Sequence, residues 1–169
     1  MTPSSVFVCG HGIDAHAILH KKNGRMWLGG VQILAGYEVI AHSDGDVVLH
    51  ALVDAILGAI GEGDIGMHFP PTDPQWENAA ARQFLAHALS LGEIHHATVI
   101  NVDVTVISEV PKVSPHKSAI RAQLASLLEM PMQRINIKAT TTEKLGFLGR
   151  KEGIAADVVV SMQLDACKS

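Results

Sequence analysis

Cysteine, aromatic residues and long hydrophobic runs are all scarce in this chain of 169 residues. Its two cysteines, Cys9 and Cys167, lie near opposite ends, so the sequence predicts neither a disulfide scaffold nor a thiolate metal site. Apolar stretches such as 47–60 are interrupted by His50 and Asp54 and are too short to span a bilayer. The N-terminal residues lack the basic start and apolar run of a secretory signal. We therefore expect a soluble, cytoplasmic protein.

The charged residues offer no general attraction for polyanions. The formal net charge is -4 at pH 7 and no dense run of Lys or Arg occurs, which argues against nucleic acids and anionic membranes as partners. A length of 169 residues suits one hydrophobic core, so we expect a single domain over residues 1–169. Because 47% of the residues are hydrophobic and only 4% are aromatic, Val, Ile, Leu and Ala should form that core.

Hydrophobic periodicity predicts strands interleaved with helices. A hairpin or tight bend is expected at Gly29–Gly30, a long loop at 61–74, and a polar turn or short helix at 140–149. The expected strands are 6–9, 25–28, 31–34, 98–108, 135–139 and 153–164, and the expected helices are one from about Ser43 to Gly61, 79–91 and 116–129. This order favours an α/β or α+β sandwich with helices packed on one sheet.

Asp14, His16 and His50 are the residues most informative about function. Asp14 and His16 are two positions apart, a spacing that projects both side chains to one face of an extended backbone. We expect them just beyond the end of the first strand, where a helix carrying His50 would have to converge on them. One carboxylate and two imidazoles suit a zinc ion with an open fourth position, as in catalytic zinc sites.

The helix expected to carry His50 is apolar apart from one ionisable stripe. Asp46, His50 and Asp54 follow at successive i, i+4 steps, and Gly58 comes next. Burying such groups is costly unless they bind one another, a metal or a ligand. A capping Asp46 with an ordinary core histidine is the alternative. Ser43 and Asp46 also resemble a capping box, which would place Ser43 at the start of the helix.

Two further clusters suit phosphate binding. His42 and Ser43 precede a helix whose free N–H groups and dipole can hold an anion, although Ser43 could simply be the N-cap. In the polar segment 138–146, Glu143 could be the single protein carboxylate of a magnesium ion, or the segment could be a capped turn. No HExxH, GxSxG or Walker A pattern occurs, which disfavours zincin chemistry, an elbow serine nucleophile and P-loop ATPase chemistry.

Taken in order, segments 10–16, 41–50, 63–66 and 138–150 resemble the motifs of one family, 2-C-methyl-D-erythritol 2,4-cyclodiphosphate synthase of non-mevalonate isoprenoid biosynthesis. The resemblance implies a homotrimer with interfacial active sites, each subunit having helices packed on one face of a four-stranded mixed sheet. It also implies a lyase in which the 2-phosphate of 4-diphosphocytidyl-2-C-methyl-D-erythritol 2-phosphate attacks the β-phosphorus, releasing CMP and closing a cyclic diphosphate.

The resemblance further implies a role for each matching residue. Asp14, His16 and His50 would bind zinc or another divalent cation, and Glu143 would bind magnesium or manganese bridging the substrate diphosphate. The other implied substrate-binding residues are His42 and Ser43 at the diphosphate, Asp64 and Gly66 at the methylerythritol hydroxyls with Ile65 between them, Asp73 in the substrate loop, Pro111, Lys112, Ala139, Thr140, Thr141 and Thr142 on the cytidine side, and Phe147 and Arg150 at the central cavity of the trimer.

The chain departs from the family pattern at three positions. Pro71 stands where the family usually has the first Asp of Phe-Pro-Asp-Thr-Asp, and Leu148 and Lys151 replace commoner small or polar residues beside Arg150. A ring of Lys151 side chains would favour anionic ligands such as prenyl diphosphates in the trimer cavity, or these side chains would face solvent. Two other functions stay open at this point: a zinc phosphohydrolase that uses metal-bound water, and a metal-stabilised oligomeric ligand carrier.

Overall fold

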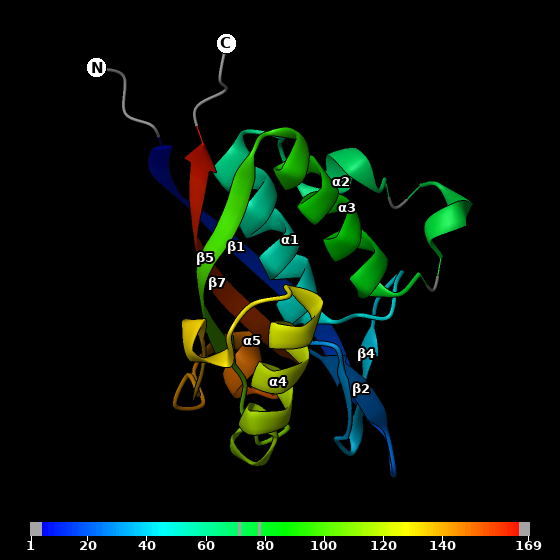
Figure 1. Cartoon of the computed structure of the whole chain (residues 1–169). Helices are drawn as coiled ribbons and strands as arrows, with labels where there is room; N and C mark the ends of the chain where they lie inside the picture. The colour runs from blue at the N-terminus through cyan, green and yellow to red at the C-terminus, as the bar shows by residue number, and fades with distance from the viewer. Residues whose placement is uncertain (1–4, 71, 78, 166–169) are drawn as a thin grey trace.

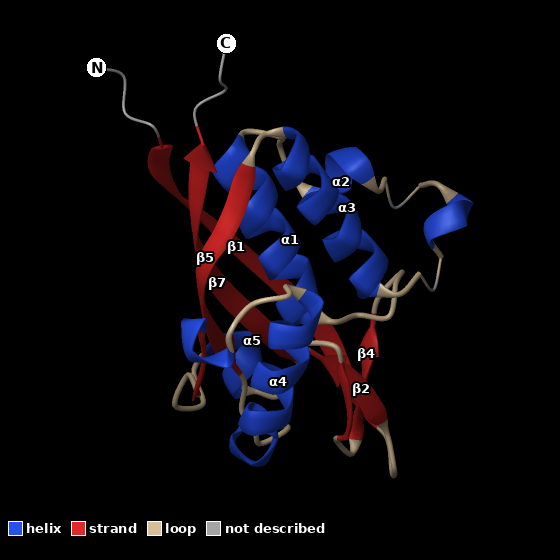
Figure 2. Cartoon of the chain, in the orientation of Figure 1, coloured by secondary structure: helices blue, strands red, loops and turns tan. Residues whose placement is uncertain are grey.

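A five-stranded sheet covered by helices organises the chain in the computed structural model, which describes residues 5–70, 72–77 and 79–165 (Figures 1 and 2). Pro71 and Cys167 lie outside the described residues. Only β5 and β6 run parallel, so the sheet is mixed. In spatial order, its strands are β4 (Tyr37–Ile40), β1 (Ser5–His20), β7 (Gly153–Asp165), β5 (Ala97–Ile107) and β6 (Ile135–Thr140).

The first strand is much longer than the sequence predicted. The expectation of a strand over 6–9 is wrong because β1 continues through Gly10 and Gly12 to His20. It pairs antiparallel with β7 over most of its length and with β4 near its end. Both glycines are buried positions within the strand and do not terminate it. Asp14 and His16 therefore lie inside β1, and not beyond its end as expected.

The four-stranded sheet implied by the family resemblance is also wrong in its strand number, because the sheet has a fifth strand, the short edge strand β4. Tyr37–Ile40 pairs with the end of β1, but four residues are too few for alternation to distinguish a strand from a loop. The hairpin around Gly29–Gly30 is confirmed: β2 (Arg25–Leu28) and β3 (Val31–Leu34) form a separate two-stranded sheet. Both turn glycines have positive φ angles, which explains why glycine occupies this tight turn.

Three long helices lie on one side of the sheet (Figure 1). These are α1 (Val47–Ile60), α3 (Ala81–Ile94) and α4 (Lys117–Leu127), so the helices predicted over 79–91 and 116–129 are confirmed within a few residues. α1 packs directly on β1 and β7, and α3 packs on α1. The short helices α2 (Ile65–His68) and α5 (Gly146–Gly149), and the 3-10 turns 74–76, 114–116 and 132–134, lie in the connections. None of the described helices is long and apolar enough to cross a membrane.

A buried carboxylate fixes the start of α1. Asp46 caps the helix, since its Oδ1 accepts hydrogen bonds from the amides of Val48 and Leu49, each at 3.1 Å. Its oxygens also accept from the two amides of the Gly29–Gly30 turn at 2.8 and 2.6 Å. The expectation that Ser43 begins the helix is therefore wrong, because the fully buried Asp46 joins the helix and the hairpin in one network.

Glycines in β1 allow the strand to pass very close to α1. A Cβ atom at Gly10 would lie 1.7 Å from the carbonyl oxygen of Ala55, and one at Gly12 would lie 2.1 Å from that of Ala51. Both obstacles are backbone atoms, which do not yield as a flexible side chain does. The separation between β1 and α1 is thus set by the absence of two side chains.

Gly10→Ala is expected to lower the free energy of unfolding by about 1–3 kcal/mol or more, because the added methyl group forces the strand and helix apart. Chemical denaturation measures this difference. The control is Gly58→Ala on α1, where a Cβ meets nothing within 4 Å and the substitution should stabilise the helix by about 0.5–1 kcal/mol. Equal stabilities of the two variants would contradict the close approach.

Candidate metal centre and adjoining cavities

Asp14, His16 and His50 meet at one point, where β1 passes beneath α1. Asp14 Oδ2 lies 2.9 Å from His16 Nε2 and 3.0 Å from His50 Nδ1, and the two ring nitrogens are 3.0 Å apart. These ligand atoms all lie within 4.8 Å of one another. No other group of three or more His, Cys, Asp or Glu side chains in the described part of the chain is similarly arranged. The structure thus brings together the three residues singled out in the sequence.

Neighbouring polar groups orient the triad. The amide of Ala15 donates to Asp14 Oδ1 at 2.8 Å, which leaves Oδ2 directed at the two rings. Ser43 Oγ lies 3.1 Å from His50 Nε2. When a metal occupies the centre of the triad, a proton on Nε2 would let His50 donate to Ser43 and present the lone pair of Nδ1 to that metal. A histidine that binds a metal needs this arrangement, with the outer N–H held by an oxygen.

Asp14 is ionised in this environment. Burial alone raises the pKa of Asp14, but the hydrogen bonds from His16 and His50, together with the charges on those rings, hold it well below its usual range. An ionised carboxylate oxygen and two imidazole nitrogens form a donor set that binds divalent transition metals well. The residues present therefore fit a divalent metal ion.

The triad borders a cavity of about 250 Å³. His42 and Ser43 reach it from the loop between β4 and α1, and Gly66 reaches it from α2 on the other side. Most of the remaining lining is apolar. The lining residues are Asp14, His16, His42, Ser43, His50, Asp54, Ile65, Gly66, Phe69, Trp76 and Phe84.

An aromatic cluster that sequence reasoning missed forms part of this lining. The ring centroid of Phe69 lies 4.9 Å from that of Trp76 and 4.4 Å from that of Phe84, which in turn lies 5.9 Å from that of His50. The chain has only four Phe, two Trp and one Tyr, and two Phe and one Trp gather here. Their scarcity is the only signal that the sequence offers, because the three residues come from separate segments.

Two aspartates hold α2 over the cavity. Asp54, one turn after His50 on α1, accepts a hydrogen bond from the amide of Ile65 at 2.7 Å. Burial raises the pKa of Asp54, and this amide opposes the shift. Asp64 caps α2 by accepting from the amide of Met67 at 2.9 Å. The third member of the ionisable stripe thus binds the backbone within the loop expected over 61–74.

Five of the six residues expected on the cytidine side line a second hollow, where β5 and β6 end. It measures about 200 Å³ and shares no lining residue with the triad cavity. The lining residues are Ser108, Pro111, Lys112, Val113, Ser114, Ala139, Thr140 and Thr141.

Glu143 and Thr142 lie on the turn after β6, next to the second hollow. Glu143 is exposed and accepts a hydrogen bond from Thr141 Oγ1 at 3.0 Å. Thr142 Oγ1 donates to the carbonyl oxygen of Leu145 at 2.7 Å. Among the residues that the structure describes, Glu143 belongs to no group of three possible metal ligands. The carboxylate of Glu109 also reaches this turn, where it accepts a hydrogen bond from the amide of Lys144 at 3.1 Å.

Three other expected site residues lie outside both cavities. Asp73 caps the 74–76 turn through a 3.0 Å hydrogen bond from the amide of Gln75. Phe147 is 49% exposed on α5. Arg150 is exposed and forms an ion pair of 2.9 Å with Glu152. A single chain thus leaves these residues apart from the triad.

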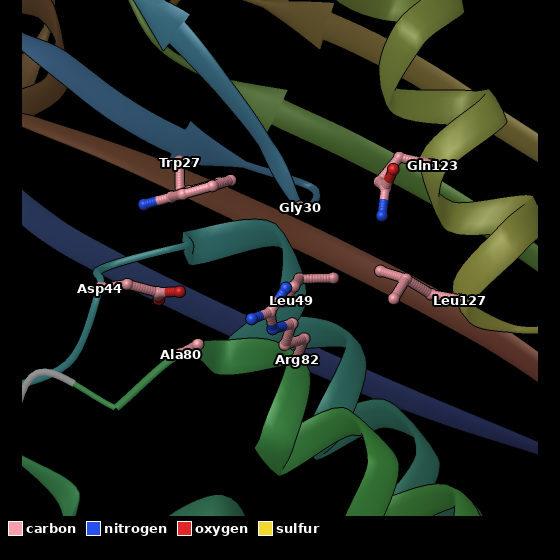
Figure 3. Close-up of a pocket in the computed structure, with 8 residues that line it drawn as sticks. All are labelled: Trp27, Gly30, Asp44, Leu49, Ala80, Arg82, Gln123 and Leu127. Atoms are coloured by element: carbon pink, nitrogen blue, oxygen red, sulfur yellow. The ribbon is translucent and has the colours of Figure 1, made fainter.

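A third cavity, of about 220 Å³, lies between the β2–β3 hairpin, the 41–46 loop, α3 and α4 (Figure 3). Asp44 contributes to its wall and also holds the loop, because its carboxylate accepts from the amides of Asp46 at 3.2 Å and Ala81 at 2.9 Å. The loop that carries His42 and Ser43 is therefore anchored to the start of α3. The lining residues are Trp27, Gly30, Asp44, Leu49, Ala80, Arg82, Gln123 and Leu127.

Comparison with known proteins gives a family and a set of relatives. The YgbB family matches residues 7–163. The bifunctional enzyme IspD/IspF of Caulobacter vibrioides is 53% identical over 157 residues, covering 93% of this chain and 41% of that protein. The structure of the bifunctional IspDF from Campylobacter jejuni has a TM-score of 0.90 at 42% identity, covering 96% of this chain and 43% of that one. IspF of Plasmodium falciparum, solved as a CDP complex, has a TM-score of 0.83 at 34% identity, covering 95% of this chain and 97% of that one. This chain thus spans less than half of the two bifunctional relatives.

Asp54→Ala is expected to speed hydrogen exchange of the Ile65 amide by about tenfold, because that amide loses a hydrogen bond worth about 1.5 kcal/mol. Asp54→Asn is the matched control, since its side-chain oxygen can still accept. Exchange followed by NMR should show a clearly smaller effect for Asn than for Ala. Equal rates in both variants and the parent protein would show that Asp54 does not hold α2.

Proposed function

The chain belongs to the YgbB family of 2-C-methyl-D-erythritol 2,4-cyclodiphosphate synthases, and we propose that it makes the cyclic diphosphate from 4-diphosphocytidyl-2-C-methyl-D-erythritol 2-phosphate with release of CMP. The observation that carries this proposal is the triad of Asp14, His16 and His50 beside a cavity that Ser43 and Gly66 also line. The CDP complex of the Plasmodium falciparum relative supports a cytidine nucleotide as part of the substrate.

The proposed reaction is an intramolecular phosphoryl transfer. An oxygen of the 2-phosphate forms a bond to the β-phosphorus, while the bond from that phosphorus to the oxygen bridging the α-phosphorus breaks. CMP leaves with the bridging oxygen. Because the substrate carries its own nucleophile, the protein needs no catalytic Ser or Cys, and its task is to position two ends of one molecule and neutralise their charge. The missing nucleophile motifs are consistent with this chemistry.

We propose that Asp14, His16 and His50 hold zinc or another divalent ion, and that Glu143 holds magnesium or manganese beside the diphosphate. When bound, such ions supply Lewis-acid neutralisation of the phosphate oxygens. Ser43 orients His50 through the 3.1 Å contact between Ser43 Oγ and His50 Nε2, and its loop offers polar groups to the diphosphate.

Other residues of the chain would bind and orient the organic parts of the substrate. The aromatic cluster of Phe69, Trp76 and Phe84 limits the entry of water beside the triad, because most of its surface is apolar. Gly66, which lines the cavity, and Asp64, the residue that caps α2, would bind the methylerythritol hydroxyls. The hollow that Pro111, Lys112, Ala139, Thr140 and Thr141 line suits the cytidine.

We propose a homotrimer as the working assembly. The sheet face opposite α1 carries exposed apolar side chains: Phe7 is 69% exposed, Ile13 60% and Val159 39%. Such a surface is typical of an interface between subunits. An assembly would also explain why the triad and the cytidine-side hollow share no lining residue, since two copies could complete one site. Phe147, Arg150 and Lys151 would then lie near the centre, where a prenyl diphosphate is a candidate ligand.

Metal-replete protein incubated with the diphosphocytidyl substrate is expected to release CMP and cyclic diphosphate in equal amounts. Phosphorus NMR in ¹⁸O-enriched water follows both products. Cyclisation incorporates no solvent oxygen, whereas a zinc phosphohydrolase that uses metal-bound water would incorporate it. Hydrolysis products in place of the cyclic diphosphate would sink the proposal.

Two histidine variants test the role of the triad in this assay: His50→Gln removes a ligand, and His20→Gln is the control. His50→Gln should lose one equivalent of bound metal and reduce CMP release by roughly 10²-fold or more while the fold is retained, because the triad loses a ligand. His20→Gln alters an exposed histidine of the same strand as His16 and should leave turnover unchanged. A ligand carrier without catalytic activity would show no turnover in any of the three proteins.

Ile13→Asp is expected to convert a trimer to smaller species, because three carboxylates would be buried in an apolar interface. Light scattering coupled to gel filtration measures the molar mass. Ile94→Asp, at a residue that is 70% exposed at the end of α3, is the control and should keep the parent mass. A monomeric parent protein would refute the proposed assembly.

A further inference from the structure

A second pair of facing imidazoles connects the end of α2 to α3. His68 is the last residue of α2 and His87 lies on α3. Nδ1 of His68 is 3.1 Å from Nε2 of His87, and both side chains are half-buried. Within the described ranges, the only other pair of ring nitrogens this close belongs to His16 and His50 of the triad, at 3.0 Å.

The backbone sets the tautomer of His68. Its Nε2 lies 2.8 Å from the carbonyl oxygen of Glu62. Because a carbonyl oxygen only accepts, Nε2 carries the proton, and in the neutral ring Nδ1 presents a lone pair toward His87. Metal-binding histidines have this same arrangement, with the outer N–H donated to a carbonyl or carboxylate and the inner nitrogen free to coordinate.

The separation of the two nitrogens matches the size of one metal ion. If an ion lies about 2.05 Å from each nitrogen and the nitrogens stay 3.1 Å apart, the N–metal–N angle is roughly 98°. This value lies between the octahedral and tetrahedral angles. Binding requires that His87 carry its proton on Nδ1 in place of Nε2 and that both rings turn until their lone pairs point at the ion and not at each other.

We propose that His68 and His87 form a second, weaker site for a divalent transition metal such as zinc or nickel, with water completing the coordination. Two imidazoles without a carboxylate select these ions over magnesium and calcium. The ring centroid of Phe69 lies 5.2 Å from that of His87 and 6.2 Å from that of His68, so an apolar ring borders the pair.

Metal at this site would cross-link the turn that carries α2 to α3. The other end of the same turn is already tied to α3, because His95 pairs with the side chain of Glu62. An ion between His68 and His87 would therefore fasten both ends of the segment that contains Asp64 and Gly66. The site is distinct from the triad and shares no ligand with it.

Zinc uptake tests the proposal without reference to turnover. Protein with its triad loaded is freed of loosely bound metal and titrated with zinc in competition with a chromogenic chelator. The expected result is one further equivalent, bound roughly tenfold or more weakly than the first because two protein ligands replace three. Uptake of no further equivalent by the parent protein would overturn the proposal.

Four variants assign the second equivalent. His68→Gln and His87→Gln should each lose it and keep the first, with circular dichroism confirming that each variant is folded. His20→Gln should keep both equivalents, and His50→Gln should keep only the weaker one. Persistence of the weaker equivalent in either His68→Gln or His87→Gln would show that the pair is only a hydrogen bond. Because the assay measures metal, its outcome is independent of the proposed cyclisation.

Hydrogen exchange supplies a second measurement. With the weaker equivalent bound, the amides of 65–69 in the parent protein should exchange about threefold or more slowly, since the turn opens less often when cross-linked. His87→Gln should show no response to zinc in this segment. A slower rate in both proteins would assign the effect to zinc bound elsewhere.

Discussion

The close approach of β1 to α1 is the constraint on which the rest of the structure depends. Gly10 and Gly12 have no side chains, so the helix backbone lies against the strand and His50 comes within 3.0 Å of Asp14 and His16. Metal–ligand distances tolerate errors of only a few tenths of an ångström. The packing of the β1 backbone against the α1 backbone therefore positions the triad, and no flexible loop carries any of its three residues.

The three ionisable residues of α1 and its N-cap each contact a different part of the fold. Asp46 joins the helix to the hairpin through backbone amides, His50 joins it to β1 through the triad, and Asp54 joins it to α2 through the amide of Ile65. Burial of polar groups in an apolar helix is tolerated because each group has partners. Successive turns of one helix thus align the three elements that surround the cavity.

Much of this arrangement was predictable from the sequence, and the failures other than the short strand β4 share one physical cause. The triad, the hairpin and the main helices follow from local spacing and periodicity. The extent of β1 could not be predicted from local patterns. In the sequence, a glycine that ends a strand cannot be told from one that allows a helix to pack closely, because the helix is distant along the chain. Asp46 replaced Ser43 as the cap for the same reason, since its additional donors come from the hairpin. The aromatic cluster likewise depends only on tertiary packing.

The walls of the cavity differ in how firmly they are held. β1 and α1 form a rigid side, because their separation is set by backbone atoms that have no room to move. The α2 side depends instead on individual polar contacts: Asp54 from α1, and His68 and Glu62 toward α3. A fixed triad facing an adjustable wall suits the proposed reaction, in which a long substrate enters and is then folded on itself. Stronger contacts from His68 and Glu62 toward α3 would therefore change the α2 side of the cavity and leave the triad in place.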